Sequence, residues 1–465
     1  MTNSKVNSEG LTLAEWQQGD EIETEIFDLT DDGDGVGRVG QRVVFVPDTA
    51  PGDRVRAKLT EVKSKLAHAK VLEVLEPSPH RIRPRCIVAD KCGGCQWQHI
   101  SEEFQLETKR QQVVQALSKI GGFAHPSVEP TLSTRNFLDY RNKASYPIGR
   151  SHRGQVQAGY YQRGSHRLIN LNQCPIQDAR FNPFLAEIKQ DIQEQGWQVY
   201  HEDRHQGEVR HLSLRIGRRT GEILLTLVLR DDRLPGLEAQ AQEWMKRYPD
   251  LVGVCINHNP DRTNVIFGKE TRCLVGRDYI REEFAGLTFQ IQSDTFFQVN
   301  TEQAEALLQE IEKELQLQGD ETLLDAYCGI GTMTLPLARR VRQAVGLELQ
   351  AESIRQAQKN ARLNQIDNAR FLVGAVERLL PKLDFSPEIV LLDPPRKGCE
   401  RSVLETLLAI RPDRIVYVSC KPATLARDLK ILCQGGQYRF VRAQPADFFP
   451  QTAHVECAAF LQAVY

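Results

Sequence analysis

One cysteine stands where a thiol could act as a nucleophile. Residues 415–429 read IVYVSCKPATLARDL, in which an apolar β-branched run predicts a strand and the segment after the proline predicts a helix. Cys420 is therefore expected at the carboxyl end of a strand, the edge of an open α/β sheet where ligands bind. Lys421 and the N-terminus of the following helix would lower the pKa of the thiol and favour the reactive thiolate. The alternative is a buried thiol at a strand end, since cysteine is among the most buried residue types.

A glycine-rich turn between a predicted strand and a predicted helix indicates a nucleoside-binding site. The segment LLDAYCGIGTMTLPLA places Gly329 and Gly331 directly after an apolar run, so the backbone can approach a ligand closely. Glu348 ends the next predicted strand about 20 residues further on, where an acid can hold a ribose diol. Thr334 stands where dinucleotide-binding proteins have a third glycine. The motif by itself is weak, and it suits an adenosine ligand without a pyrophosphate, S-adenosylmethionine (SAM).

The sequence LLDPPRKG adds a stiff loop at the end of another predicted strand. Asp393 follows the apolar run, and Pro394 and Pro395 stiffen the loop and leave its carbonyls without competing local donors. A loop of the D/N-P-P type can hold a planar base that has been flipped out of its stack. An ordinary Pro-Pro turn is the alternative, and the glycine-rich turn upstream favours the base-binding interpretation.

Four cysteines indicate a metal site. Cys86, Cys92 and Cys95 follow a C-x5-C-x2-C spacing, and the Gly-Gly pair between the last two lets the backbone curl around a cluster. Cys174 in LNQCPIQ is the best candidate for a fourth ligand, because a proline also follows the last cysteine of ferredoxin-type runs. One triplet with a distant Cys-Pro favours a [4Fe-4S] cluster over zinc, whose structural sites usually bring two short pairs.

Length, charge and the N-terminal sequence limit the class of protein. A chain of 465 residues is long for a single core and predicts two to four domains. Lys plus Arg number 59 and Asp plus Glu number 61, so any surface for a polyanion must be local. The start MTNSKVNSEG does not resemble a signal peptide and no long apolar run follows, which predicts a cytoplasmic protein. In that compartment, eleven cysteines indicate metal binding or catalysis rather than disulfides.

Changes in hydrophobic period divide the chain. In residues 16–78 apolar residues alternate between turn clusters such as DDGDGVG, which predicts a small barrel of the oligonucleotide-binding kind. The segment carries more acid than base, so an interaction barrel without a nucleic-acid role is the alternative. An amphipathic helix is expected over residues 102–122, and further alternating stretches predict a mainly β central domain. In the last third, strands alternate with helices, which predicts a doubly wound parallel sheet.

One stretch is basic and free of acid. Residues 140–177 contain no Asp or Glu, and aromatic side chains are interleaved with their cations. Basic groups follow phosphates and aromatic rings stack bases, so this stretch is the best candidate for a polynucleotide surface. A solvated charged face is the alternative. The side chains concerned are Arg141, Lys143, Arg150, His152, Arg153, Tyr160, Tyr161, Arg163, His166 and Arg167.

Taken together, these motifs resemble those of the TRAM-containing RNA (uracil-5-)-methyltransferases, the family that makes 5-methyluridine in ribosomal or transfer RNA. The resemblance runs nearly end to end, through the N-terminal barrel, CIVADKCGGCQWQH with the later CPI, SDTFFQVN, LDAYCGIGTMTLPLA, LLDPPRKG, YVSCKPATLARDL and HVECAAFL. The chain departs from the family's pattern at Thr332, where several members have Asn, and at Ala375, where some have Asn or Asp.

The resemblance implies a multidomain protein that combines α/β and β architecture. It implies an N-terminal TRAM barrel, a mainly β central domain with an iron-sulfur cluster and RNA-binding surface, and a C-terminal Rossmann-like class I methyltransferase domain. The helix around Val113 is expected to pack on the methyltransferase domain, and the protein is expected to be a monomer. The expected boundaries are a flexible tail over 1–15, the barrel over 16–78, the central domain over 79–101 and 137–290, and the methyltransferase domain over 102–136 and 291–465.

The resemblance also implies roles for single residues. Cys420 would be the nucleophile and Glu456 the base, with a pKa that burial raises towards the working pH. Without the resemblance, Glu456 in AHVECAAF would be interpreted as a surface acid at a strand end. The implied SAM contacts are Gln298, Tyr327, Gly329, Gly331, Glu348 and Asp393, and the implied ligands of a [4Fe-4S] cluster are Cys86, Cys92, Cys95 and Cys174.

The implied reaction is methylation of uridine at C5 with SAM as the methyl donor. C5 of uracil is a poor nucleophile, but addition of the Cys420 thiolate at C6 makes C5 enolate-like, and Glu456 would later remove the C5 proton. We expect RNA as the partner, with 23S ribosomal RNA preferred over uridine 54 of transfer RNA. Two other classes stay open, namely a methyltransferase acting on an exocyclic amine and a non-enzymatic iron-sulfur RNA-binding protein. Because the reaction transfers no electrons, the cluster would act as a structural clamp.

Overall fold

The computed structural model describes residues 16–465, and the predicted tail over residues 1–15 lies outside the described residues. The chain folds as two compact units. The first unit ends at Thr108 and takes in Gln451–His454, and the second consists of Lys109–Pro450 and Val455–Tyr465. No helix within residues 16–465 has the length and hydropathy needed to cross a membrane.

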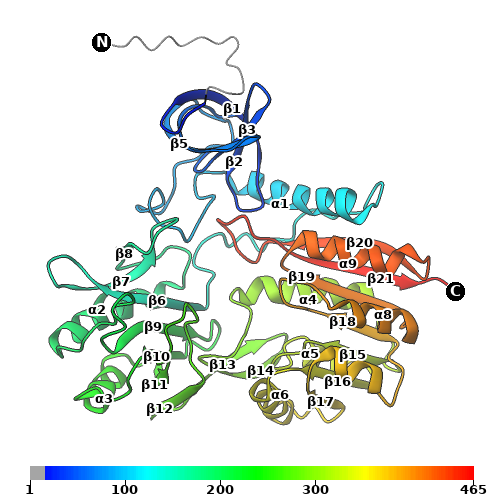
Figure 1. Cartoon of the computed structure of the whole chain (residues 1–465). Coiled ribbons are helices and arrows are strands. Elements are labelled where there is room, and N and C mark those ends of the chain that lie inside the picture. The colour runs from blue at the N-terminus through cyan, green and yellow to red at the C-terminus, as the bar shows by residue number, and fades with distance from the viewer. Residues whose placement is uncertain (1–15) are drawn as a thin grey trace. The chain divides into compact units, whose positions relative to one another are not determined.

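The first unit contains a closed five-stranded barrel, as the alternating apolar residues predict (Figure 1). The strands follow the order β1-β2-β3-β5-β4 around the barrel, and β3 and β5 run parallel. Ile26, Val44 and Val55 point inward and are fully buried, because successive side chains of a strand face opposite sides. The strands are β1 (Glu21–Leu29), β2 (Gly35–Val39), β3 (Arg42–Val46), β4 (Arg54–Val62) and β5 (Leu66–Glu76).

A buried tryptophan holds the segment that follows the barrel. The Trp97 indole Nε1 donates a hydrogen bond to the carbonyl oxygen of Gly33 at 3.2 Å. Gly33 has a φ of +90°, and a Cβ at this position would lie 2.9 Å from Nε1. The turn therefore requires glycine both for its backbone conformation and for the close approach of the indole.

The first half of the second unit is a mixed sheet of seven strands in the order β12-β11-β10-β9-β6-β7-β8. Every residue of β10 is buried, as expected for a strand that is covered on both faces. Helix α2 contacts β7, and α3 contacts β11 and β12, so the central domain also contains two helices that its alternating pattern did not predict. The elements are β6 (Lys143–Arg150), β7 (Val156–Tyr161), β8 (Leu168–Asn170), the 3₁₀ turn η2 (Ala179–Phe181), α2 (Asn182–Glu194), β9 (Val209–Ile216), β10 (Ile223–Leu229), α3 (Leu237–Arg247), β11 (Leu251–His258) and β12 (Glu270–Gly276).

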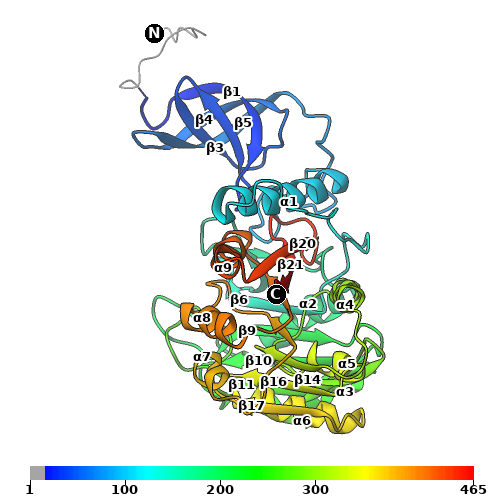
Figure 2. The same ribbon diagram turned by 90° about the vertical axis from the view of Figure 1, so that its right-hand side faces the viewer.

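The second half of this unit is a doubly wound sheet, as the alternation of strands and helices predicts. Its strand order is β17-β16-β15-β18-β19-β21-β20, and β21 runs antiparallel to both of its neighbours, β19 and the edge strand β20. Figure 2 shows α4, α5 and α6 on one face of this sheet and α7, α8 and α9 on the other. The elements are α4 (Thr301–Leu315), β15 (Thr322–Ala326), α5 (Thr334–Ala338), β16 (Gln343–Glu348), α6 (Ala351–Leu363), β17 (Ala369–Val373), α7 (Val376–Leu379), the 3₁₀ turn η3 (Leu380–Lys382), β18 (Ile389–Leu392), α8 (Arg401–Ile410), β19 (Arg414–Ser419), α9 (Pro422–Gln434), β20 (Tyr438–Ala446) and β21 (Glu456–Ala463).

A short hairpin joins the two sheets of this unit. Its strands are β13 (Tyr279–Phe284) and β14 (Leu287–Gln292); β13 contacts β9, β10 and β11, and β14 contacts α6. The two residues of the turn, Ala285 and Gly286, have φ values of +51° and +72°. Positive φ at both central residues matches the twist of a tight hairpin.

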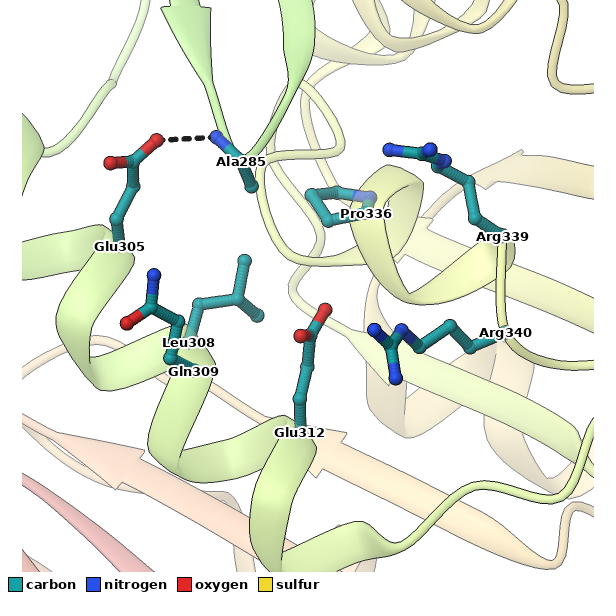
Figure 3. A pocket seen from close by; sticks show the side chains of 8 residues that line it. All are labelled: Ala285, Glu305, Leu308, Gln309, Glu312, Pro336, Arg339 and Arg340. Atoms are coloured by element: carbon teal, nitrogen blue, oxygen red, sulfur yellow. Dashed lines mark hydrogen bonds between the residues drawn. The ribbon is translucent and has the colours of Figure 1, made fainter.

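Glu305 of α4 fixes the turn of this hairpin. Its carboxylate accepts a hydrogen bond from the Ala285 N–H at 2.5 Å and forms an ion pair with Arg219, which lies in the loop after β9. Figure 3 shows the pocket beside these groups, which Arg339 and Arg340 also line. Glu305 lines this pocket and joins α4 to the hairpin and to the loop after β9, so the pocket has a structural role.

The helix α1 (Glu102–Ala116) is anchored by a buried ion pair in its second half. The Lys109 and Asp447 side chains are both fully buried, with Nζ at 2.5 Å from Oδ1. Nζ also donates to the carbonyl oxygen of Phe449 at 3.1 Å. Val113 and Leu117, the latter in the π-helical turn η1 (Leu117–Gly121), join the apolar cluster on one face of the C-terminal sheet.

Lys109→Met should destabilise the second unit, because it leaves the Asp447 carboxylate buried without its partner. Loss of one member of a buried ion pair costs about 3–5 kcal/mol. We expect this loss in urea unfolding of the full chain, and we expect the double variant Lys109→Met/Asp447→Leu to recover most of it. A loss below ~1 kcal/mol for Lys109→Met would contradict an energetic role for the pair.

Candidate active site

A pocket opens beyond the carboxyl ends of β15 and β18, where the sequence predicts the cofactor. Gln298, Tyr327, Gly329 and Asp393, four of the six residues predicted to contact SAM, line it together with the predicted base Glu456. The sequence analysis missed the apolar part of its walls, because nothing in the local pattern distinguishes these residues from the core. They include Phe284, Phe296, Leu307, Ile311, Met333 and Phe448.

The glycine-rich turn after β15 has an unusual backbone. Tyr327 has a φ of +128°, Gly329 of +54° and Gly331 of +85°. A non-glycine residue with positive φ is uncommon, and such strain is concentrated at functional sites. The N–H groups of Tyr327 and Cys328 both donate to the carbonyl oxygen of Leu347, at 3.0 and 2.9 Å, which ties the turn to β16.

Glu348 ends β16, as predicted, and its carboxylate supports the turn. Oε2 accepts the N–H of Gly329 at 3.2 Å, and Oε1 accepts the N–H of Gln350 at 2.8 Å. Six residues are predicted to contact SAM. Gly331 lies in the turn, Glu348 lies next to it, and the other four are in the walls of the pocket.

Thr334, which replaces the third glycine of the dinucleotide fingerprint, fixes a buried acid. Its Oγ1 donates to Asp325 Oδ2 at 2.5 Å. Burial raises the pKa of Asp325 to about 7, although the hydrogen bond from Thr334 lowers it. Burial, and then the charge of Asp325, likewise raise the pKa of Asp393 to about 7. Two acids at this site, Asp325 beside the turn and Asp393 in the wall of the pocket, thus have raised pKa values.

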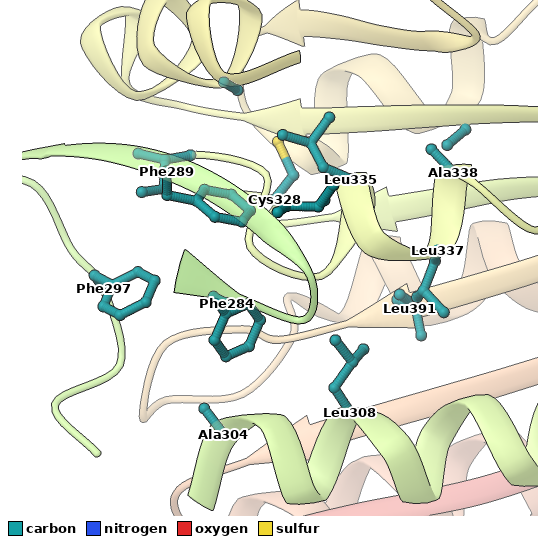
Figure 4. Close-up of a cluster of buried hydrophobic side chains, with 14 of the residues drawn as sticks. Phe284, Phe289, Phe297, Ala304, Leu308, Cys328, Leu335, Leu337, Ala338 and Leu391 are labelled. Carbon is teal, nitrogen blue, oxygen red and sulfur yellow. The ribbon is translucent and has the colours of Figure 1, made fainter. Parts of the chain in front are cut away.

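An apolar cluster supports the pocket, as Figure 4 shows. The rings of Phe284 and Phe297 meet edge to face with centroids 5.7 Å apart, and Ala304 and Leu308 of α4 belong to the same cluster. Phe296, by contrast, is 69% exposed although it lines the pocket. A large exposed ring at the edge of a pocket can stack on a planar group.

Cys420 lies between β19 and α9, in the strand–loop–helix placement that the sequence predicts. Its thiol is half-buried, and the Arg396 side chain hydrogen-bonds it. The expected lowering of its pKa is wrong, because burial and the charge of Glu456 raise the pKa of the Cys420 thiol and Arg396 offsets them only in part. Lys421 is exposed, so water screens its charge.

Glu456 is buried next to the thiol, and not at the surface. In the antiparallel pairing of β19 with β21, Ser419 lies opposite Cys457, and the same register places Cys420 opposite Glu456. Burial, and then the charge of Asp393, raise the pKa of Glu456 well above its usual value. The predicted direction of this shift is confirmed.

Arg396 is the polar residue of the site that the sequence analysis missed. Its guanidinium hydrogen-bonds the Cys420 thiol, and its charge lowers the pKa of both Cys420 and Glu456. The sequence did contain a signal for Arg396, which directly follows Asp393-Pro-Pro. A loop that holds a flipped nucleobase also has to carry polar side chains that surround that nucleobase.

A buried carboxylate connects the two loops of the site. Asp428 of α9 is fully buried, and its Oδ2 accepts the Tyr417 hydroxyl at 2.6 Å and the Cys399 N–H at 2.9 Å. Arg427 donates from Nε to Oδ1 of the same carboxylate at 2.8 Å. The helix that begins after Cys420 thus anchors the loop over residues 393–399.

The four cysteines predicted to hold a [4Fe-4S] cluster, Cys86, Cys92, Cys95 and Cys174, are all half-buried. Within residues 16–465, no three His, Cys, Asp or Glu side chains gather in a way that could hold a metal ion. The predicted cluster therefore has no support from this arrangement of side chains.

The acid-free stretch over residues 140–177 forms β6, β7, β8 and their turns. A groove on this part of the sheet has a mixed charge, because loop residues outside the stretch add Glu202 and Asp203, and Glu202 pairs with His166. The cationic and aromatic residues that line the groove are Arg150, His152, Tyr161, His166, Arg167, Tyr200, His201 and Arg262.

Two family models match the chain. The tRNA (uracil-5-)-methyltransferase family matches residues 101–464, and the TRAM domain matches residues 15–72. An uncharacterized RNA methyltransferase of Nostoc sp. is 66% identical over 451 residues, which cover 97% of this chain and 98% of the relative. A second uncharacterized RNA methyltransferase, from Halalkalibacterium halodurans, is 41% identical over 448 residues, which cover 96% of this chain and 97% of the relative.

A solved structure is similar over almost the same length. The crystal structure of Pyrococcus abyssi tRNA (uracil-54, C5)-methyltransferase in complex with S-adenosyl-L-homocysteine has a TM-score of 0.76 and 28% sequence identity. The match covers 94% of this chain and 99% of that chain. Family models, relatives and fold agree, and the chain belongs to the tRNA (uracil-5-)-methyltransferase family of RNA methyltransferases.

Proposed function

We propose that the protein transfers the methyl group of SAM to C5 of a uridine in RNA. The observation that carries this proposal is the position of a half-buried thiol, Cys420, opposite a buried carboxylate, Glu456, which lines the pocket. Methylation at C5 requires both a nucleophile for C6 and a base for the C5 proton, whereas methylation of an exocyclic amine does not need a thiol.

The charges around the pocket support SAM as the donor. Asp393 and Glu456 line the pocket, and Asp325 and Glu348 lie at the turn that borders it. Acidic groups favour a ligand that carries positive charge on its sulfonium and ammonium groups. The similar structure from P. abyssi was solved in complex with S-adenosyl-L-homocysteine, which is SAM without the methyl group.

In the proposed mechanism, SAM supplies an electrophilic methyl group, and the residues of this chain activate the uracil ring. The Cys420 sulfur, after its thiol proton is released to solvent, adds to C6 of uracil, so that C5 gains electron density. C5 then bonds to the methyl carbon while the bond from that carbon to the SAM sulfur breaks, and S-adenosyl-L-homocysteine leaves. Glu456 then accepts the C5 proton, the double bond re-forms, and the bond between C6 and sulfur breaks. Arg396 donates a hydrogen bond to the sulfur, which stabilises its negative charge before addition and after elimination.

We propose 23S ribosomal RNA as the substrate, with uridine 54 of transfer RNA as the alternative. The alternative is supported by the solved relative, whose name specifies uracil-54 of tRNA. An N-terminal TRAM match and the acid-free stretch over residues 140–177 support an RNA partner of either kind. We also expect a cytoplasmic monomer.

The iron-sulfur cluster remains a proposal that rests on the spacing of Cys86, Cys92 and Cys95 and on the Cys-Pro sequence at Cys174. If it is present, its role is structural, and the proposed reaction needs no step through it.

Cys420→Ala should lower the rate of methylation by at least ~1000-fold, because the nucleophile is lost. The wild-type protein should form a covalent complex with RNA that contains 5-fluorouridine, since fluorine at C5 leaves no proton for Glu456 to remove. Cys420→Ala should not form this complex. Denaturing gels and mass spectrometry of the adduct measure both results.

Two matched variants complete this test. Glu456→Gln should accumulate the covalent complex with ordinary uridine, because addition and methyl transfer precede proton removal. Cys433→Ala changes another half-buried thiol, on α9, and should behave like the wild type. Unchanged turnover of Cys420→Ala would instead favour an exocyclic-amine methyltransferase, and a lack of saturable SAM binding in calorimetry would favour a non-enzymatic RNA-binding protein.

Deletion of the gene should remove 5-methyluridine from 23S ribosomal RNA and leave it in transfer RNA. Mass-spectrometric mapping of both RNAs measures the change, and complementation with Cys420→Ala should not restore the modification. If the methyl group is lost from uridine 54 of transfer RNA instead, the substrate is transfer RNA and not 23S ribosomal RNA.

Protein purified without oxygen should contain about four iron and four sulfide ions per chain if the proposed cluster exists. Cys174→Ala should lose iron, whereas Cys433→Ala should retain it. Elemental analysis and visible absorption measure the content. Iron-free protein that methylates RNA at the full rate would remove the cluster from the proposal.

A further inference from the structure

Two cations, the half-buried Lys143 and the buried Arg215, lie side by side at the start of β6. Lys143 of β6 is directly opposite Arg215 of β9 in the antiparallel register. Arg215 is 2% exposed, and its Nη2 donates to the carbonyl oxygen of Thr295 at 2.6 Å. Its Nε and Nη1 are buried and have no hydrogen-bond partner among the described residues. The structure therefore encloses positive charge whose hydrogen-bonding capacity is largely unused.

One carboxylate faces these two cations. Asp294 interacts electrostatically with both Lys143 and Arg215, and it is exposed and also accepts the hydroxyl of Thr271 at 2.9 Å. Burial lowers the pKa of Lys143 well below its usual value and that of Arg215 to about 10, which reflects the cost of charge without sufficient compensation. An anion that bound here would reduce this cost.

The cations lie next to the loop over residues 293–300, which contributes Phe296 and Gln298 to the pocket. Asn142, the neighbour of Lys143, donates from Nδ2 to the carbonyl oxygen of Gln298 at 2.8 Å, and Arg215 binds the same loop at Thr295. Lys143 and Arg215 themselves are not among the residues that line the pocket within the described chain. They stand beside the methyl-transfer site rather than inside it.

Lys143 is the member of the pair that a ligand can reach. It is partly exposed, and its Nζ lies 4.7 Å from the centroid of the Phe267 ring, so an aromatic surface borders the ammonium group. Arg215 lies behind it and keeps the site positive. A lysine with a compact charge and free donors is suited to an oxyanion.

We propose that Lys143, supported by Arg215, binds a backbone phosphate of the RNA next to the nucleotide whose base enters the pocket. This inference rests on the proposed function in so far as the ligand is RNA. The shared chemistry is that of an oxyanion, which the carboxylate of SAM could also provide. We assign the site to the phosphate because neither cation lines the pocket predicted to hold SAM.

Lys143→Met should weaken binding of the full-length protein to an oligouridylate about ten-fold, the amount expected for loss of one hydrogen bond to a charged group. The slope of log K against log salt concentration should decrease by about one, because one fewer counterion is released. Lys143→Arg should retain most of the affinity and the slope. The matched control is Lys359→Met, which removes an exposed lysine on α6 and should change neither. Titrations at several KCl concentrations measure these quantities.

Two further measurements decide the source of the anion and the integrity of the fold. SAM affinity of Lys143→Met in calorimetry should equal that of the wild type, and a loss of several-fold would overturn the phosphate in favour of the carboxylate of SAM. The unfolding midpoint of Lys143→Met should not fall, because the change removes a half-buried charge that is repelled by Arg215. A folded Lys143→Met with unchanged RNA affinity and salt slope would refute the inference.

This test is independent of the proposed reaction. Affinity and salt slope are measured without turnover, so the phosphate site can fail while the wild type still forms the covalent 5-fluorouridine complex. Conversely, the absence of that complex would refute the C5 mechanism and would leave the salt slope as it is.

Discussion

The antiparallel pairing of β21 with β19 is the constraint on which the active site depends. Parallel strands bring their carboxyl ends to one edge of the sheet, and this alone places Asp393 and Cys420 near each other. β21 runs in the opposite direction, so that its first residue, Glu456, arrives at the same edge. A shift of the register by one residue would turn the carboxylate to the other face of the sheet, because side chains alternate along a strand.

The electrostatics of the site follow from this placement. Burial raises the pKa values of three carboxyl groups, and neighbouring charges add to this: Glu348 acts on Asp325, Asp325 on Asp393, and Asp393 on Glu456. Arg396 lowers the pKa values of both Cys420 and Glu456. Burial and neighbouring charge outweigh it, so both pKa values lie above their usual range. Such a site suits a base that must take a proton from carbon.

Buried polar groups hold the parts of this site in position. Asp428 joins α9 to the loop over residues 393–399, and the Lys109–Asp447 pair holds α1 against the segment before β21. A hydrogen bond or ion pair in the interior has strict geometry, and a partner left without it is costly. These contacts therefore position loops that apolar packing alone would leave less well defined.

The sequence by itself determined the features that depend on neighbours along the chain. Alternation predicted the barrel, alternation of strands with helices predicted the doubly wound sheet, and local motifs placed Cys420 and Glu348 at strand ends, as the structure has them. The helices α2 and α3 were missed because the strands around them dominate the pattern of the central domain.

Only the tertiary structure decided which groups meet. It buried Glu456 next to Cys420 through strand pairing. It also reversed the expected shift of the thiol pKa, because burial and then the charge of Glu456 raise it, whereas Lys421, adjacent in sequence, is exposed. Burial and electrostatic interaction depend on distances in space, and spacing along a sequence specifies these only within one element and its adjoining turn.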